Sequence, residues 1–345
     1  MMLFQKVNSN SQLSGTIRSK PEDFQVDEIQ SFIPSGQGEH VWLHIKKTGE
    51  NTDWVAGQLA KAADVLRRDV SFAGLKDRHA VTTQWFSVWM PGREAPNWQD
   101  FLSDSIQIID EKRHNRKLRR GALVGNTFQI ILRDFKGDES ELQTSLERIK
   151  DQGIPNYFGE QRFGHFEADQ NGFFNILKAE QWFKGDFKIK GRQKRSIYLS
   201  AARSWIFNHI LSERVKAGTW NQAIQGDVFM LGGSKSSFSE SVDEVIIDRV
   251  AKKDIHPTGA LWGRGRVLSQ DGVADIENAV ASELSILCDG LENHGLKQER
   301  KALRLKVDDL GYNLVEDDST VVKLSFSLPA GAYATSVLSE LGDFS

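Results

Sequence analysis

A single carboxylate, Asp77, stands among basic and titratable residues in the stretch 75–80 (LKDRHA). The segments on either side, 70–73 and 82–89, carry the apolar pattern that predicts β-strands. Asp77 therefore lies in a strand-to-strand connection, a place where catalytic groups are common. Neighbouring cations favour a charged carboxylate, which suits a nucleophile or a base. The alternative is an ordinary turn residue that hydrogen-bonds its own backbone.

Other kinds of chemistry lose support because their motifs are absent from the sequence. The chain contains no GxGxxG after a strand, no P-loop, no HExxH and no GxSxG. Its eight histidines are scattered without the spacing of metal ligands. We therefore expect acid–base or nucleophilic carboxylate chemistry and no metal site.

Length and composition describe a globular protein. A chain of 345 residues is long enough for two domains, and a content of 39% hydrophobic and 26% charged residues is typical of a folded, soluble chain. The only cysteine, Cys288, excludes a disulfide framework and fits a reducing compartment. No apolar run approaches the ~18 residues of a membrane span. The sequence thus predicts a cytoplasmic protein with no membrane partner.

Positive charge is concentrated in two places although the formal net charge is −3. Residues 112–120 and residues 184–195 each contain six lysines or arginines. Segregated charge of this kind indicates a face for a polyanion, which makes RNA or DNA the expected partner. Two solvated basic loops are the alternative.

Hydrophobic periodicity predicts an α+β fold. Strands are expected at 40–46 and 125–133, and helices at 53–67, after an Asn51-Thr52 cap, and at 139–150. The pattern becomes more helical after Gly153-Ile154-Pro155, and the later predicted elements are helices at 195–216 and 275–287 and a strand at 313–327. Strand-rich flanks around a different centre suggest one domain from residues 1–151 and 305–345, with residues 152–304 inserted as a second lobe.

Five segments, in order along the chain, resemble the motifs of the TruD family of tRNA pseudouridine synthases. The family's central signature corresponds to FAGLKDRHAVTTQ around Asp77. The other four are RSKPEDFQVDE at 18–28, RG with GNTF at 120–128, NYFGEQRFG at 156–164 and LPAGAYATSVL at 328–338. One such match is a modest signal, whereas five in the expected order are highly specific.

The resemblance implies a pseudouridine synthase-type catalytic domain, with a mostly antiparallel sheet flanked by helices, and an inserted α/β lobe that forms a two-lobed cleft with it. It also implies the reaction: Asp77 attacks uridine 13 in the D arm of tRNA, the glycosidic bond breaks, and the base turns over and reattaches through carbon, with no cofactor or metal. Whether the carboxylate attacks the base or the sugar is left open. The expected partner is tRNA, with other structured RNA as a possibility, and the expected state is a monomer.

Site residues carried over from the family fall around Asp77. Arg18 matches the basic residue that pairs with the aspartate, with Lys20 as the alternative, and Asn126 matches the base-contacting position. Phe24, Phe128 and Tyr333 match positions that could stack on a flipped base, although core packing is the commoner role for a single aromatic residue. Tyr333 departs mildly from the family, where phenylalanine is frequent.

Contacts to RNA are expected from the basic residues near these motifs and in the two basic runs, namely Lys76, Arg78, His79, Arg113, Arg116, Lys117, Arg119, Arg120, Arg162, Arg192, Lys194 and Arg195. The first three could instead bind carbonyls of their own turn. The box 156–164 could equally form a packing hinge, and 256–263 (HPTGALWG) resembles a family element of unassigned role. A non-catalytic RNA-binding protein or RNA chaperone is the alternative function. A hydrolase is weaker because no second carboxylate lies in a motif fit to serve as its acid.

Overall fold

The computed structural model describes residues 4–315 and 318–345, which form two compact units. The Asp77 unit comprises Gln12–Leu146, Val307–Ala334 and Gly342–Ser345. The α4 unit comprises a short N-terminal segment that ends at Ser11, together with Glu147–Lys306 and Thr335–Leu341. These bounds reflect packing, and the division of the chain at residues 152 and 304 into a catalytic domain and an insertion stays a prediction.

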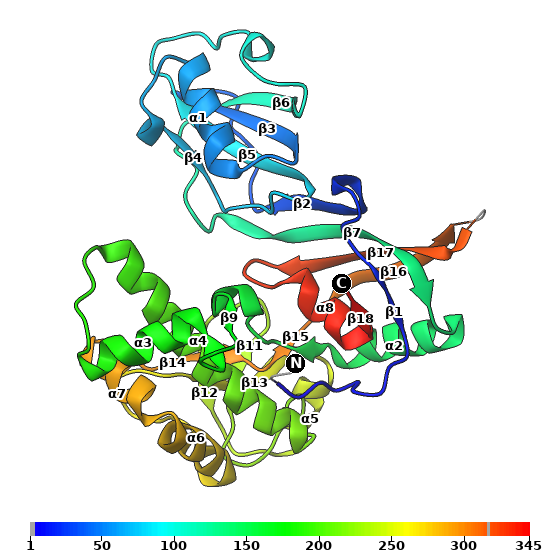
Figure 1. Ribbon diagram of the computed structural model, residues 1–345, viewed down its shortest axis with the longest axis vertical. Coiled ribbons are helices and arrows are strands. Elements are labelled where there is room, and N and C mark those ends of the chain that lie inside the picture. The colour runs from blue at the N-terminus through cyan, green and yellow to red at the C-terminus, as the bar shows by residue number, and fades with distance from the viewer. Residues whose placement is uncertain (1–3, 316–317) are drawn as a thin grey trace. The chain divides into compact units, whose positions relative to one another are not determined.

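A large twisted sheet forms the Asp77 unit (Figure 1). Its main path runs β16-β17-β7-β2-β5-β3-β6. Off this path, β4 pairs with β5, and β1 pairs with β7 and β18. Strands β2 and β5 are parallel, as are β1 and β18, while the other pairings in the described residues are antiparallel. The strands are β1 (Ser14–Thr16), β2 (Phe24–Gln30), β3 (His40–Thr48), β4 (Val70–Phe72), β5 (Val81–Trp89), β6 (Ile106–His114), β7 (Leu123–Lys136), β16 (Asp308–Val315), β17 (Asp318–Pro329) and β18 (Asp343–Phe344).

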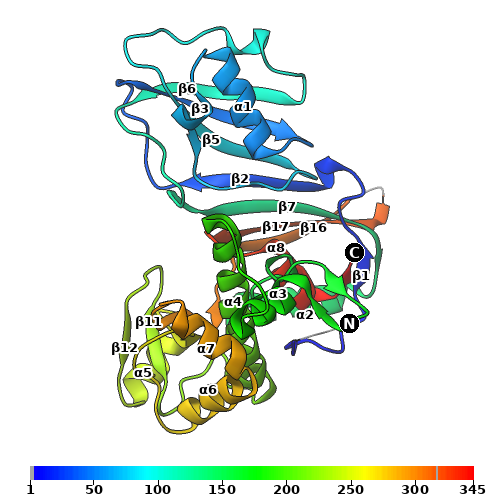
Figure 2. The ribbon, with the colours of Figure 1, turned by 60° about the vertical axis from the view of Figure 1, so that its left-hand side comes forward.

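Helix α1 (Thr52–Ala62) covers one face of this sheet, as both ribbon views show (Figures 1 and 2). The Asn51 side chain caps the helix by accepting from the Asp53 N–H. Val55 and Leu59 pack against the inward face of β3, including Leu43, in one buried cluster. Each fully buried side chain of this size contributes about 1.5–3 kcal/mol. The prediction that the helix continues to residue 67 was wrong.

The early end of α1 has a backbone cause. The C-cap Ala63 is followed by Asp64, whose φ of 50° is left-handed and cannot continue a right-handed helix. A 3₁₀ turn at Arg67–Asp69 then leads into β4. Leu66, which lies within the predicted helix, is exposed.

The α4 unit is built around the 25-residue helix α4 (Arg192–Lys216), whose buried side includes Ala201, Ile206 and Ile210. Helices α3 (Phe174–Lys184), α6 (Asp271–Glu283) and α7 (Ser285–Asn293) pack against it. A four-stranded sheet of order β12-β11-β13-β14 completes the core. The remaining elements are β8 (Ile154–Pro155), β9 (Phe166–Glu167), β10 (Gly172–Phe173), β11 (Val228–Leu231), β12 (Ser237–Ser239), α5 (Glu244–Ala251), β13 (Ile255–Leu261), β14 (Glu299–Ala302) and β15 (Arg304–Leu305).

Two further elements differ from the prediction. The helix expected at 275–287 is two helices, because Leu284 leaves the helical conformation between α6 and α7. The strand expected at 313–327 is a hairpin of β16 and β17, and residues 316–317 between them lie outside the described residues. Helix α2 (Glu139–Gln152) agrees with the helix expected at 139–150, and α8 (Ala334–Leu341) follows β17.

The HPTGALWG segment supplies the core of the α4 unit. It forms β13, which lies between β11 and β14. His256 accepts a hydrogen bond from Arg304 at 3.0 Å, and burial together with that cation lowers the pKa of His256 to about 4. A Cβ at Gly259 would approach Leu303 to 3.0 Å and Phe207 to 3.2 Å, so glycine permits this close packing. The segment therefore has a clear structural role.

No helix within the two described stretches, 4–315 and 318–345, is both long enough and apolar enough to span a membrane.

Candidate active site

Strand pairing brings Arg18 and Asp77 to the same edge of the large sheet. Because β2 and β5 are parallel, with Gln25 opposite Val81, both strands begin at that edge. Asp77 lies in the connection that leads from β4 into β5, four residues before Val81. Arg18 precedes the first residue of β2 by six residues. Two segments far apart in the sequence thus place a guanidinium beside a carboxylate.

An ion pair joins these two side chains and leaves both partly open to solvent. The Nη2 of Arg18 lies 2.8 Å from Oδ2 of Asp77, and the side chains are 27% and 31% exposed. The backbone N–H of His79 donates to Oδ1 of Asp77 at 3.2 Å. The carboxylate is therefore oriented by two donors and still reachable by a substrate.

Arg18 is itself fixed in two ways. Its φ of 58° is left-handed, a conformation that costs a non-glycine residue about 1–2 kcal/mol. Its guanidinium carbon lies 4.2 Å from the centroid of the Phe24 ring, so the cation stacks on the aromatic face. The ring holds the guanidinium in line with Asp77.

A buried ion pair anchors the turn between Arg18 and Phe24. Asp23 has no exposed surface and accepts two hydrogen bonds from Arg133, at 2.9 and 2.7 Å. The hydrogen bond from Arg133 holds the pKa of the Asp23 carboxyl below its usual value. The backbone N–H of Lys20 also donates to Asp23 at 3.2 Å, while the Lys20 side chain is exposed. Asp23 is a positioning residue that the sequence analysis did not single out.

Three buried polar side chains support the Asp77 connection from inside the sheet. Thr52 accepts from the Lys76 N–H at 3.0 Å and donates to Gln84 at 3.0 Å. Gln84 in turn donates to the Gly74 carbonyl at 3.1 Å. The Lys47 ammonium donates to the main-chain carbonyls of Asp77 and Glu50, at 3.0 and 2.7 Å. This network fixes the backbone while leaving the Asp77 carboxylate free for other partners.

Lys47 is the most unusual member of that network. Burial, helped by the nearby charge of Lys76 and opposed by Asp77 and Glu50, lowers the pKa of the Lys47 ammonium to about 8. Sequence analysis missed this residue, although a signal was present. Lys47 continues the inward face of β3 that begins with Val41, and a lysine on an apolar strand face requires an explanation.

Lys76 lies in the site rather than in solvent. Its ammonium hydrogen-bonds Oδ1 of Asn126, the residue that matches the base-contacting position. Burial lowers the pKa of Lys76, and the carboxylates of Glu28 and Asp27 oppose that shift. Because an ammonium can only donate, this contact turns the amide Nδ2 of Asn126 away from Lys76.

The three aromatic candidates occupy different environments. Phe24 and Phe128 are 3% and 5% exposed and meet edge to face at 6.3 Å, and Phe128 also stacks on Phe326 at 5.3 Å. Both rings are packed in the core of the Asp77 unit. Tyr333 is half-buried in the connection after β17. Stacking on a base stays a prediction for all three.

Several of the residues expected to contact RNA have contacts within the protein. Arg78 donates to the Gly49 carbonyl at 3.3 Å, Arg113 to the Arg93 carbonyl at 2.6 Å, and Lys117 to the Arg68 carbonyl at 2.8 Å. Arg162 donates to the Ser200 hydroxyl at 2.9 Å. Exposed positions are held by His79, Arg116, Arg119, Arg120, Arg192, Lys194 and Arg195.

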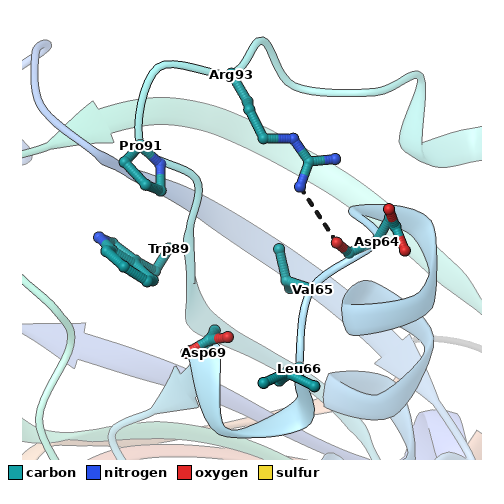
Figure 3. A pocket seen from close by; sticks show the side chains of 7 residues that line it. All are labelled: Asp64, Val65, Leu66, Asp69, Trp89, Pro91 and Arg93. Atoms are coloured by element: carbon teal, nitrogen blue, oxygen red, sulfur yellow. Dashed lines mark hydrogen bonds between the residues drawn. The ribbon is translucent and has the colours of Figure 1, made fainter.

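A hollow of about 410 Å³ elsewhere in the Asp77 unit contains none of the expected site residues (Figure 3). Trp89 and Pro91 line it, and Arg93 donates to the main-chain carbonyl of Asp64 at its rim. Trp89 ends β5, whereas the Asp77 connection meets the beginning of that strand, roughly 27 Å away at 3.4 Å per residue. The hollow is therefore separate from the Asp77 site. Across the described residues, no cluster of three His, Cys, Asp or Glu side chains could hold a metal ion.

The fold and the site together define an α+β protein with a carboxylate held at the edge of its large sheet. The family model described as tRNA pseudouridine synthase D (TruD) matches residues 5–171 and 174–341. The chain is 49% identical to the tRNA pseudouridine synthase D of Methylococcus capsulatus over 331 residues, covering 96% of this chain and 91% of that protein. It is 48% identical to the tRNA pseudouridine synthase D of Aeromonas salmonicida, covering 95% and 90%.

A solved structure has the same fold. The crystal structure of a putative tRNA pseudouridine synthase D from Methanosarcina mazei superposes with a TM-score of 0.75 and 21% identity, covering 98% of this chain and 95% of that one. The resemblance inferred from the five motifs is confirmed: the chain belongs to the TruD family of tRNA pseudouridine synthases.

Proposed function

We propose that this enzyme converts uridine 13 in the D arm of tRNA to pseudouridine, with Asp77 as the nucleophile and without a cofactor. The observation that carries the proposal is the partly exposed Asp77 carboxylate, which Arg18 orients at 2.8 Å while Lys47 fixes its backbone.

The reaction is an isomerisation, so its atoms balance within the uridine and water. An oxygen of Asp77 attacks either the base or the ribose, and the bond between C1′ and N1 breaks. The base turns, a bond forms between C1′ and C5, and the bond to the Asp77 oxygen breaks, which regenerates the carboxylate. C5 loses its proton to solvent and N1 gains one. Arg18 keeps the carboxylate in the attacking orientation, since a charge-assisted bond of this kind is directional.

Uracil presents two carbonyl acceptors and one N–H donor. With Oδ1 of Asn126 occupied by Lys76, Nδ2 of the same amide is the group that donates to a uracil carbonyl. A flipped base also needs an apolar surface. The aromatic candidates for that surface are Tyr333, which is half-buried, and the buried Phe24 and Phe128.

The substrate, by this proposal, is folded tRNA, and other structured RNAs with a similar arm are further candidates. Exposed basic residues such as Arg116, Arg119 and Arg120 follow β6 and provide positive charge for the phosphate backbone. We propose a monomer that acts in the cytoplasm, where tRNA is modified.

Site specificity is tested by mapping pseudouridine with a carbodiimide-based primer-stop assay. Unmodified tRNA with uridine 13 is compared with the same tRNA carrying cytidine 13. The proposal predicts a stop at position 13 in the first RNA and none in the second. A stop at another uridine in both RNAs would overturn the assignment of position 13. Binding without any stop, on several tRNAs, would instead indicate a binding protein.

A further inference from the structure

The exposed side of helix α4 carries a groove of about 660 Å³. Six of its lining residues recur at helical spacing on one face of α4, and Leu296 forms the opposite wall. The six are Arg192, Arg195, Ser196, Leu199, Ser200 and Arg203. The groove lies wholly within the α4 unit and shares no residue with the Asp77 site.

The lining carries three guanidinium groups and no carboxylate. Arg203 is held in the wall, because it pairs with Glu299 at 3.1 Å and donates to the carbonyls of Leu261 and Lys297. Arg192 and Arg195 are different. Within the described residues, neither side chain makes a hydrogen bond or an ion pair, and both are exposed. Two free guanidinium groups thus point to an anionic ligand from outside the chain.

We propose that this groove binds the phosphate backbone of the RNA substrate, with Arg192 and Arg195 contacting phosphate oxygens. Guanidinium groups match phosphate geometry through paired N–H donors. The volume falls in the range of about 300–1,000 Å³ that small-ligand sites occupy, which is sufficient for a nucleotide. Leu199 and Leu296 offer apolar contact to a ribose or base, and Ser196 offers a hydroxyl.

The inference rests on the proposed tRNA substrate. It also assigns different roles to neighbouring basic residues that the sequence analysis grouped together. Lys194 lies between Arg192 and Arg195 in the second basic run, yet it does not line the groove. At 100° per residue it projects from the opposite side of the helix. An experiment can therefore distinguish the effect of positive charge anywhere in this basic run from the effect of the two arginines that line the groove.

The test measures the dissociation constant for an unmodified tRNA transcript as a function of salt. Arg192→Ala with Arg195→Ala is compared with Lys188→Ala with Lys190→Ala, since each pair removes two positive charges from the same exposed basic run. The groove pair is expected to weaken binding about tenfold and to reduce the slope of log K against log salt by about 1.5. The control pair is expected to change the dissociation constant less than about twofold.

Equal losses from both pairs, or none from the groove pair, would overturn the proposal. Thermal unfolding must show that both double variants remain folded. For pseudouridine formation, the groove pair is expected to raise KM with kcat unchanged. If the proposed function fails, no variant forms pseudouridine, but the binding comparison still reports on the groove.

A free nucleotide is the other source of the same phosphate chemistry. Titration with AMP distinguishes it from RNA. The RNA assignment predicts that millimolar AMP binds weakly and competes poorly with tRNA. Tight AMP binding by the wild type that the groove pair abolishes would assign the site to a free nucleotide and contradict the proposal.

Discussion

Two arginine–aspartate pairs in this enzyme are built from the same groups in opposite surroundings. In the α4 unit, Arg214 donates to both oxygens of Asp227, at 2.7 and 3.1 Å, and the two side chains are 1% and 0% exposed. In the Asp77 unit, Arg18 donates once to Asp77, and nearly a third of each side chain is exposed. The first pair is buried, whereas the second is held in position but partly exposed to solvent.

The comparison shows the same two groups in two environments, one buried and one partly open to solvent. Burial raises the pKa of Asp227 against the opposing hydrogen bonds from Arg214, so this pair depends on both partners being present. A buried pair that loses one partner leaves an uncompensated charge. Asp77 keeps its backbone fixed by the buried Lys47 instead, which leaves its carboxylate available to a substrate.

The largest effect is expected from breaking the enclosed pair. Arg214→Met should lower the free energy of unfolding by about 3–5 kcal/mol, because Asp227 would remain buried without its partner. Urea denaturation followed by circular dichroism measures this change. At a temperature where the variant is folded, kcat should be close to that of the wild type. A loss below about 1 kcal/mol would show that the enclosed pair is not structural in this sense.

Breaking the open pair should have the opposite profile. Arg18→Met is expected to reduce kcat about 100-fold, because Asp77, the proposed nucleophile, loses its orienting donor. Stability should change by less than about 1 kcal/mol, since the pair is partly exposed. Lys20→Met, two residues away and exposed, is the matched control and should retain kcat. A variant with normal kcat and reduced stability would reverse the roles assigned to the two pairs.

The support beneath Asp77 can be tested through pH. A group whose pKa is lower in the folded state than in the unfolded state contributes stability above its unfolded pKa and loses it as pH falls through the folded value. For Lys47 the interval runs from about 10.5 down to about 8. Relative to Lys47→Met, the wild type should gain about 2–3 kcal/mol of unfolding free energy as pH rises across that interval. If the unfolding free energies of the wild type and Lys47→Met changed in parallel with pH, the lowered pKa of Lys47 would be contradicted.

The smallest effect concerns the two cations that flank Asp77 in the sequence. Lys76→Met should lower kcat/KM about tenfold, because Asn126 loses the donor that sets its amide. Arg78→Met should change it less than about threefold, since its exposed bond to the Gly49 carbonyl is weak. Steady-state kinetics on tRNA measures both. Equal losses of kcat/KM would mean that the nearness of these two side chains to Asp77 in the sequence matters, and not which group each side chain contacts.

Local patterns allowed much of the fold to be predicted, because one face of each element is buried. The strand at 40–46 and the helix at 195–216 agree with β3 and α4. Long-range pairs left no such trace. Asp23 and Arg133 are 110 residues apart, and no periodicity links them. The expectation that Arg18 pairs with Asp77 came from family resemblance, and only the parallel register of β2 and β5 explains the contact.

The most direct test of the central claim is the single-turnover rate of pseudouridine formation at uridine 13 by Asp77→Asn. Asparagine keeps the size of the side chain and removes its negative charge. We predict no detectable product, a loss of at least about 10³-fold, with the dissociation constant for tRNA within about twofold of the wild type. Product formation by this variant at a rate near that of the wild type would contradict the role of Asp77 as the nucleophile.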